Sequence, residues 1–167
     1  SRYTSVKEQI GRVIVGHEAQ ALQEVIGARA EIMLNDRFAE TNSLYSLWLA
    51  RDWVKGPFIL LNCDLFFDPR ILDELLDQPG NALAYDSTSS RGREQTKVAL
   101  KAGRVVDLGK DLPANSARGE SLGMLKFDAE GARAMMSVAK QLIADGHENA
   151  WVIEATRTVC KDIEMSG

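Results

Sequence analysis

The feature that most constrains the fold is the segment at residues 58–62 (FILLN), in which an unbroken apolar run, residues 58–61, is followed by Asn62. A short apolar run of this kind, without alternation, is typical of a strand that is buried on both faces of a parallel sheet. Asp68-Pro69 follows it and predicts the start of a helix, with the aspartate as the cap and the proline in the first turn. We therefore expect residues 58–62 to be the clearest strand of an α/β layer.

Around this run, the first 80 residues alternate between short apolar segments and segments with helical spacing. This alternation predicts a doubly wound α/β fold with parallel strands and right-handed crossovers. The strands are expected at residues 12–15, 31–34 and 58–62, and the helices at 18–26, from Thr41 or Asn42 to 54, and after Asp68.

The second half of the chain has a different pattern. Ala102-Gly103 separates two short apolar segments and predicts an antiparallel hairpin. A polar loop is expected at residues 87–95, strands at 82–85, 97–100, 104–108 and 123–127, and helices at 129–145 and about 150–163.

Composition narrows the class of protein. Apolar residues make up 45% and charged residues 26% of the 167, which is typical of a soluble globular domain. The net charge of -4 disfavours nucleic acid as a partner, and no apolar run approaches the roughly 20 residues that span a bilayer. Cys63 and Cys160, like His17 and His147, lack the spacing of a zinc site, so we interpret the cysteines as reduced thiols of a cytoplasmic protein.

Polar residues follow three of the expected strands: Asn35-Asp36, Asn62-Cys63-Asp64 and Asp86. Ligands of open α/β sheets bind at the carboxyl ends of the strands. Asp64 is the sharpest candidate, because a single carboxylate together with substrate phosphates can hold Mg²⁺. The alternative is an aspartate that only stabilises the turn after the strand.

Further along the chain, Lys97 and Lys110 are candidate phosphate ligands, although a solvated surface lysine is the more common role of each when it is taken alone. Trp151 and Glu154 are three residues apart on an expected helix, where an aromatic face beside a carboxylate suits an ammonium group. An ordinary amphipathic helix is the alternative. Neither a G-x-x-x-x-G-K-[ST] loop nor a G-x-G-x-x-G loop occurs, which disfavours kinase-type and dinucleotide-binding functions.

Four segments together resemble the sugar-phosphate-type nucleotidyltransferases, and most of all the branch of phosphocholine and phosphonoalkyl cytidylyltransferases. They are residues 35–76, 96–112 (TKVALKAGRVVDLGKDL), 119–127 (GESLGMLKF) and 149–155 (NAWVIEA). The resemblance implies a GT-A-like three-layer α/β fold, with a mostly parallel sheet and an antiparallel hairpin in its second half. It also implies one domain, in which residues 1–86 bind the nucleotide and residues 87–167 bind the acceptor.

The activity implied by the resemblance is Mg²⁺-dependent transfer of a nucleotidyl group, with CTP favoured, to a small phosphorylated or phosphonate acceptor such as phosphocholine or 2-aminoethylphosphonate. Pyrophosphate is released. Carried over by position, Asp64 matches the family's metal ligand, and three residues match its nucleoside pocket: Asn35, Thr41 and Asn42. Lys110 and Glu120 match residues on the acceptor side, and Lys97 matches a lysine of the hairpin. Trp151 and Glu154 lie where the branch shapes its acceptor pocket.

The sequence also departs from the family pattern. Residues 1–9 do not match the glycine-rich loop with which members begin, and Asp162 is a poor match for their second metal-binding aspartate. We therefore expect an incomplete domain. Two alternatives stay open: a GT-A glycosyltransferase, disfavoured because Asp64-Leu65-Phe66 lacks a second aspartate, and an inactive domain that binds nucleotide or assembles with partners, a second copy of the chain among them.

Overall fold

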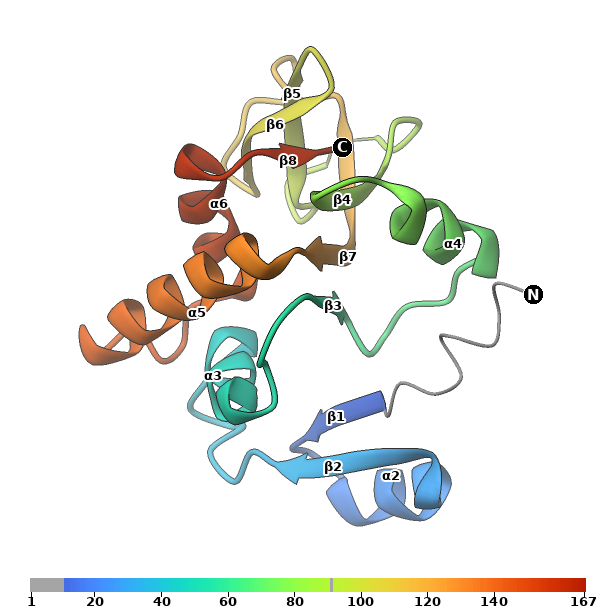
Figure 1. The fold of residues 1–167 in the computed structure, drawn as a ribbon, viewed down its shortest axis with the longest axis vertical. Coiled ribbons are helices and arrows are strands. Elements are labelled where there is room, and N and C mark those ends of the chain that lie inside the picture. Colours follow the sequence, from blue (N-terminus) through green and yellow to red (C-terminus); the bar gives the residue numbers. More distant parts are fainter. Residues whose placement is uncertain (1–10, 91) are drawn as a thin grey trace.

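The computed structural model describes residues 11–90 and 92–167. Its first part, which we call the N-terminal unit, contains β1 (Gly11–Val15), α2 (Ala19–Ile26), a 3-10 turn η1 (Gly27–Arg29) and β2 (Ala30–Leu34). β1 and β2 pair in parallel along their whole length, from Gly11 opposite Ala30 to Val15 opposite Leu34. The expected strand–helix–strand order is thus confirmed (Figure 1).

The helices that follow begin where local chemistry predicts. Asn42 is the N-cap of α3 (Ser43–Leu49), and its side chain accepts a hydrogen bond from Ser43 N. Asp68 caps α4 (Pro69–Asp77) in the same way, by accepting from Arg70 N. Between these helices lie a 3-10 turn, η2 (Ala50–Asp52), which replaces the expected end of the helix, and the strand β3 (Phe58–Leu61).

The remaining chain forms most of a six-stranded sheet with the order β3-β7-β4-β8-β6-β5. The hairpin at Ala102-Gly103 is confirmed. The short strand β8 was not expected from the sequence. The elements are β4 (Asn81–Asp86), β5 (Lys97–Lys101), β6 (Arg104–Gly109), β7 (Gly119–Phe127), α5 (Ala129–Ala144), α6 (Val152–Asp162) and β8 (Met165–Ser166).

The expectation of a mostly parallel sheet is wrong. β7 lies between β3 and β4 and runs antiparallel to both, so β3 and β4 are parallel to each other without pairing. Among the described residues, the parallel pairs are β1–β2 and β4–β8, and every other strand pair is antiparallel. The sequence suggested a strand only from Gly123, whereas β7 begins at Gly119 and bends at Gly123, where φ is +70°.

The position expected for residues 58–62 is also wrong. Among the described residues β3 pairs with β7 alone, so it stands at one edge of the six-stranded sheet that they form. Its side chains are half-buried, and Leu61 is 42% exposed. The apolar run therefore has the sequence of an interior strand in an edge position.

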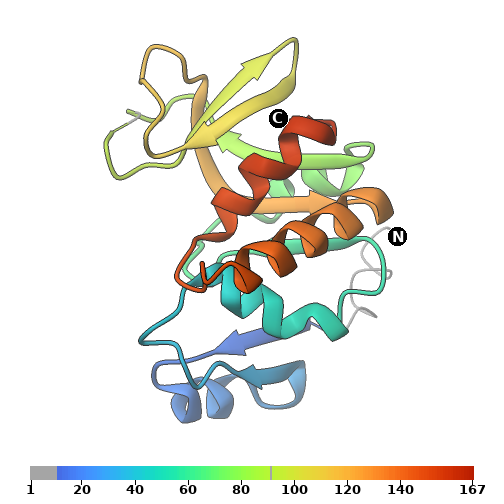
Figure 2. The same cartoon turned by 90° about the vertical axis from the view of Figure 1, so that its left-hand side faces the viewer.

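The main core joins both halves of the chain. α3, α5 and α6 pack together over one face of the sheet (Figure 2), where the buried residues include Leu44, Met135 and Val159. Phe127 of β7 is fully buried there and stacks on Phe58, with 4.9 Å between the ring centroids. A smaller cluster around Leu75 and Met124 lies between α4 and the sheet. Within the described ranges, no helix is long and apolar enough to cross a bilayer.

Candidate active site

Asn35 and Asp64 follow strands, whereas Lys97 and Glu120 lie within β5 and β7. The carboxyl ends of β1, β3 and β4 point towards the same side, as does the segment that leads into α6 (Figure 2). Asn35 follows β2, which is parallel to β1, and Asp64 follows β3. The structure therefore places the two strand-end motifs at one edge, where open α/β folds bind ligands.

The loop after β2 is built on Asn35, which is buried. Its amide Nδ2 donates to Thr41 Oγ1 at 3.1 Å and to Ser46 Oγ at 3.3 Å, and its Oδ1 accepts from Arg37 N at 3.0 Å. Thr41 Oγ1 in turn donates to the Arg37 carbonyl at 2.8 Å. The predicted nucleoside residues Asn35 and Thr41 thus shape the loop through one another, and Asn42 begins α3.

This loop is joined to the segment before α6, which is more than 100 residues away in sequence. Arg37 donates two hydrogen bonds to the Glu148 carboxylate, at 3.0 Å and 2.6 Å, and Asn42 N donates to the Glu148 carbonyl. The Arg37 guanidinium holds the pKa of Glu148 below its ordinary value, because the hydrogen bonds favour the carboxylate. The loop after β2 and the segment before α6 are therefore one connected structure.

Lys97 is 4% exposed, so it is not the solvated surface lysine of the alternative interpretation. It lies on β5, with Gly109 of β6 and Glu120 of β7 as its neighbours across the ladder. Its ammonium donates to the carbonyls of Lys110 and of Gln95. Lys97 therefore fixes the residue 110 backbone and places a cation next to β7.

Lys110 and Trp151 meet in space. The Lys110 ammonium lies 5.4 Å from the Trp151 ring centroid and 3.6 Å from a Glu94 carboxylate oxygen. Both side chains are accessible, and Trp151 is 51% exposed. A lysine over an indole face is a favourable cation–π arrangement. Glu154, the third member of the predicted acceptor group, accepts a hydrogen bond from Trp151 N at 2.9 Å and so caps α6.

Arg157 of α6 holds the end of the hairpin against that helix. It donates to the Asp107 carboxylate at 2.6 Å and 3.0 Å, and to that of Asp111 at 2.9 Å and 3.0 Å. The same guanidinium keeps the pKa of Asp111 below its ordinary range. Lys110 lies between Asp107 and Asp111 in the sequence, just after the end of β6. The hydrogen bonds of Arg157 to these two aspartates therefore help to hold Lys110 beside Trp151.

Glu120 and Asp86 occupy opposite positions on β7 and β4. Ser89 Oγ donates to Glu120 Oε2 at 2.6 Å, which draws the loop after β4 onto β7. Asp86 accepts from both the backbone N and the hydroxyl of Thr88, and these bonds lower its pKa. Glu120 of β7 is thus the neighbour of Lys97 of β5 across the ladder. The two residues that were predicted on the acceptor side and on the hairpin are therefore adjacent.

Asp64 lies in the turn after β3 and is exposed. The turn is attached to β7 where Asn62 N donates to the Gly123 carbonyl at 3.0 Å. Its carboxylate has no hydrogen bond or ion pair with the residues that the structure describes, in contrast to Asp68, which caps α4 and pairs with Arg70. A group of three or more potential metal ligands is likewise absent from the described residues. Asp64 is therefore a single free carboxylate.

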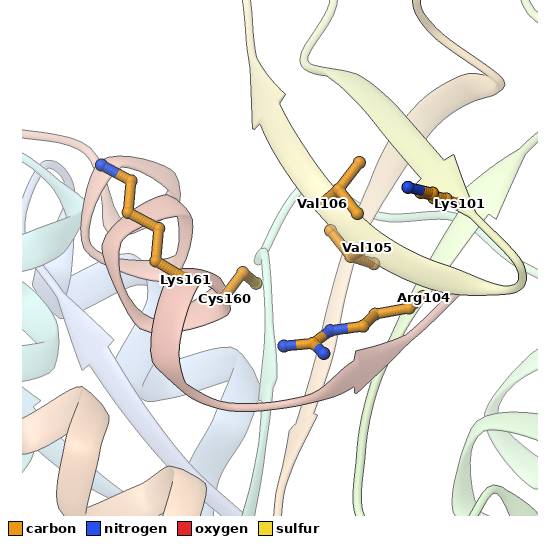
Figure 3. A pocket seen from close by; sticks show the side chains of 6 residues that line it. All are labelled: Lys101, Arg104, Val105, Val106, Cys160 and Lys161. Carbon is orange, nitrogen blue, oxygen red and sulfur yellow. The ribbon is translucent and has the colours of Figure 1, made fainter.

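The cavities lie elsewhere. One of about 370 Å³ is lined by Lys101, Arg104 and Cys160 among others, and Figure 3 shows Arg104 directed towards Cys160 while Lys161 turns away. Burial raises the pKa of the Cys160 thiol to about 12, so it remains protonated and unreactive. A second cavity of about 300 Å³ lies between α4 and β4. None of the predicted site residues lines either of these two cavities.

The sequence analysis missed the residues that connect the site. Arg37 pairs with Glu148, which is 111 residues away in the sequence. Arg157 pairs with Asp107 and Asp111, which are about 50 residues away. No local sequence pattern identifies these residues as partners. The arginines were visible only as unassigned cations next to predicted site segments. A search for cations flanking the candidate residues is the one sequence signal that would have selected them.

Solved structures of nucleotidyltransferases share this fold. The inositol-1-phosphate CTP transferase from T. maritima superposes with a TM-score of 0.71 at 17% identity, over 96% of this chain and 67% of that one. The CTP:phosphocholine cytidylyltransferase from Streptococcus pneumoniae gives 0.68 at 16% identity, over 99% and 71%. A UDP-glucose pyrophosphorylase gives 0.63 at 9%, over 95% and 72%. No family model matches the sequence, and no curated protein does. The chain thus has the nucleotidyltransferase fold and spans about two thirds of these proteins.

Proposed function

We propose that the chain forms the metal-binding and acceptor-binding parts of a nucleotidyltransferase that uses Mg²⁺, with CTP as the favoured nucleotide. One observation carries the proposal: Lys97 holds the backbone of Lys110, whose ammonium lies over the exposed ring of Trp151. Asp64 adds a carboxylate at the carboxyl end of β3 that has no protein partner among the described residues. The fold shared with CTP-dependent transferases supports it.

The residues present fit a single Mg²⁺. This ion is commonly held by one or two carboxylates together with substrate phosphates, and Asp64 is a carboxylate without a protein partner among the described residues. When bound, the ion neutralises phosphate charge. Asp64 is the residue that would hold it, and the connection of Asn62 to Gly123 keeps the turn of Asp64 against β7.

The reaction requires positioning and charge neutralisation more than a nucleophilic side chain. An oxygen of the acceptor phosphate forms a bond to the α-phosphorus of the triphosphate, and the bond to the pyrophosphate leaving group breaks. In this proposal Lys110, held by Lys97 and by the Arg157 network, binds the acceptor phosphate. Trp151, whose ring is exposed beside it, contacts the organic part of the acceptor.

In this proposal Lys110 binds the phosphate end of the acceptor and not its organic end. Its ammonium already lies on the Trp151 face, so a second cation on the same face would be repelled. A phosphate or phosphonate that draws Lys110 away frees this face for the rest of the acceptor. Phosphocholine and 2-aminoethylphosphonate carry a phosphate or phosphonate and also an ammonium group that suits the aromatic face, whereas glucose-1-phosphate carries only the phosphate.

The test is pyrophosphate release with Mg²⁺, using CTP or UTP with phosphocholine, 2-aminoethylphosphonate, inositol-1-phosphate or glucose-1-phosphate. We expect release with CTP and one of the first two acceptors. Release with UTP and glucose-1-phosphate instead would contradict both the base and the acceptor of the proposal. Mg²⁺-dependent CTP binding without release would favour the inactive nucleotide-binding domain.

The metal role is tested by Asp64→Asn. We expect kcat/KM to fall on the order of 100-fold or more, because a metal ligand at the phosphates stabilises the transition state by several kcal/mol. Asp68→Asn is the matched control: it removes a carboxylate four residues away but keeps a side chain that can cap α4. Equal activity of wild type and Asp64→Asn would remove Asp64 from the mechanism.

A further inference from the structure

The cavity between the β5–β6 hairpin and α6 has a cationic lining. Its volume is about 370 Å³, within the range of roughly 300–1,000 Å³ in which proteins hold small molecules. Three of its six lining residues are cations and none is a carboxylate; the six are Lys101, Arg104, Val105, Val106, Cys160 and Lys161 (Figure 3). The chain as a whole has a net charge of -4, so this cavity is a local exception to the charge of the protein.

The central cation of this lining, Arg104, is half-buried without a counter-charge. Of the three half-buried arginines in the described structure, the other two are paired: Arg37 bonds Glu148, and Arg157 bonds two aspartates. Arg104 has no hydrogen bond or ion pair with a described carboxylate. Removing a charge from water is costly unless an opposite charge meets it. Arg104 therefore lacks the partner that the other half-buried arginines have.

A second cation stands directly opposite Arg104. Lys101 of β5 and Arg104 of β6 form the last pair of the hairpin ladder, next to the turn at Ala102-Gly103. Residues that are directly opposite in an antiparallel ladder project from the same face of the sheet, where like charges repel each other. Lys101 also has no ion pair with a described residue. The hairpin thus holds two positive charges side by side, and pairing within the described structure does not neutralise them.

The uncharged part of the lining includes exposed apolar surface. Val106 is 47% exposed, and Trp151 is the only other large apolar side chain that is exposed in the described structure from β4 to β8. Cys160 of α6 lies on the other side of the cavity, and Figure 3 shows Arg104 reaching towards it. Burial raises the pKa of the Cys160 thiol to about 12, so this wall is uncharged. The lining therefore combines positive charge with neutral, partly apolar surface.

The cavity is distant from the candidate active site. β6 rises about 17 Å from Arg104 to its last residue, and Lys110 follows that far end. Along α6, Trp151 is the N-cap and Lys161 belongs to the last turn, about 15 Å away. Lys110 and Trp151 meet at one end of these two elements, whereas the cavity lies at the other end. A ligand in the cavity is therefore separate from a ligand at Lys110.

We propose that this cavity binds a phosphate monoester of a small organic molecule, with the phosphate between Lys101 and Arg104 and the organic part against Val106. A phosphate monoester carries a charge of about −1.5 to −2 at pH 7, which matches the two cations of the hairpin. The planar guanidinium of Arg104 suits phosphate oxygens, because it donates two parallel hydrogen bonds. A carboxylate brings a single charge and leaves part of the repulsion between the cations. This inference does not rest on the proposed catalytic function.

The probe is phenyl phosphate, titrated into isotope-labelled protein while the NMR shifts of backbone amides are followed. We expect saturable shifts at Val106 and Lys161, which lie on opposite walls of the cavity. Binding should be about tenfold or more tighter than that of phenol or benzoate, which lack the phosphate dianion. It should be about threefold or more tighter than that of inorganic phosphate, which lacks the apolar group. Equal binding of any of these three compounds would overturn the proposed ligand class.

Two variants test the paired cations. Arg104→Gln is expected to weaken phenyl phosphate binding about tenfold or more, because it removes the charge and the paired donors. Arg133→Gln, at an exposed arginine of α5 outside the lining, is the matched control and should stay within about twofold. Lys101→Gln should weaken binding about fivefold. Because Lys101 is exposed, this variant keeps the test decisive if Arg104→Gln does not fold. Unchanged binding in the folded variants would contradict the proposal.

A third variant separates the cavity from the candidate active site, where a phosphate is also proposed to bind. In Lys110→Gln, the shifts that phenyl phosphate causes at Val106 and Lys161 should be unchanged. If they disappear in Lys110→Gln and persist in Arg104→Gln, the phosphate binds at the candidate active site and the assignment to the cavity is wrong. Because none of these readouts is turnover, they remain informative if the pyrophosphate-release assay fails.

Discussion

The N-terminal unit and the region from β4 to β8 use the same kinds of element, yet they are packed very differently. Before residue 35, Val15 is the only buried apolar residue in the described structure, and α2 contributes none. α6, in contrast, buries Val152, Ala155, Thr156, Val159 and Cys160. Amphipathic spacing is present in both helices, so spacing alone does not produce burial. α6 is buried because it packs on both β6 and α5, whereas α2 packs mainly on β2.

Strand pairing and packing against a covering layer are therefore separate requirements. The N-terminal unit satisfies its ladder along all five residue pairs but lacks a second neighbour on the β1 side among the described residues. The region from β4 to β8 has a covering layer of helices, and its ladders persist across register shifts at Ala84/Tyr85 and Ala99/Leu100.

The largest effect is expected from Phe127→Ala in the well-packed region. Phe127 is fully buried and stacks on Phe58, so the free energy of unfolding should fall by about 3–5 kcal/mol. Leu22→Ala in α2 is the matched change in the N-terminal unit, and about 0.5 kcal/mol or less is expected because Leu22 is exposed. Urea unfolding of both variants measures the difference. Similar losses would show that α2 is packed as tightly as the core.

A smaller effect is expected at the junction of the two regions. Asn35→Ala removes a buried amide that bonds Thr41, Ser46 and the backbone of Arg37, so the free energy of unfolding should fall by about 1–3 kcal/mol. Hydrogen exchange is expected to accelerate first in β1 and β2. Asn115→Ala, at an exposed asparagine, is the control and should change little. Uniform acceleration in β4 to β8 would place the junction elsewhere.

The smallest effect is a pH dependence of the tie between Arg37 and Glu148. Arg37 lowers the pKa of Glu148 in the folded state, from an ordinary value of 4.5. The unfolded state therefore binds more protons below about pH 4.5, and this contribution to stability is complete above that pH and is lost as the pH falls through the depressed folded pKa. Glu148→Gln should lower the urea midpoint slightly at pH 6 and make its decline in acid shallower.

Glu40→Gln is the control for that experiment, because Glu40 lies 3.7 Å from the same guanidinium without the paired hydrogen bonds. A decline in acid that is the same in wild type and in Glu148→Gln would show that the ion pair does not contribute to the pH dependence.

The sequence predicted the elements whose determinants are local. The caps Asn42 and Asp68, the hairpin at Ala102-Gly103 and the strand–helix order of the first half are all confirmed. The resemblance of short motifs predicted the fold shared with nucleotidyltransferases, and the structure confirms that fold without testing the roles assigned to individual residues. The roles of Asp64, Lys110 and Trp151 remain predictions, and the structure brings Lys110 and Trp151 together.

What the sequence by itself determined are features set within a few residues: a side chain that caps the next turn, a glycine that permits a hairpin, and an apolar run that must leave water. Only the tertiary structure decided that β7 lies antiparallel between β3 and β4, that Lys97 is buried, and that Arg37 meets Glu148. These features depend on which distant segments become neighbours. A local pattern fixes how much a segment gains from burial and pairing, but not which distant segment provides it.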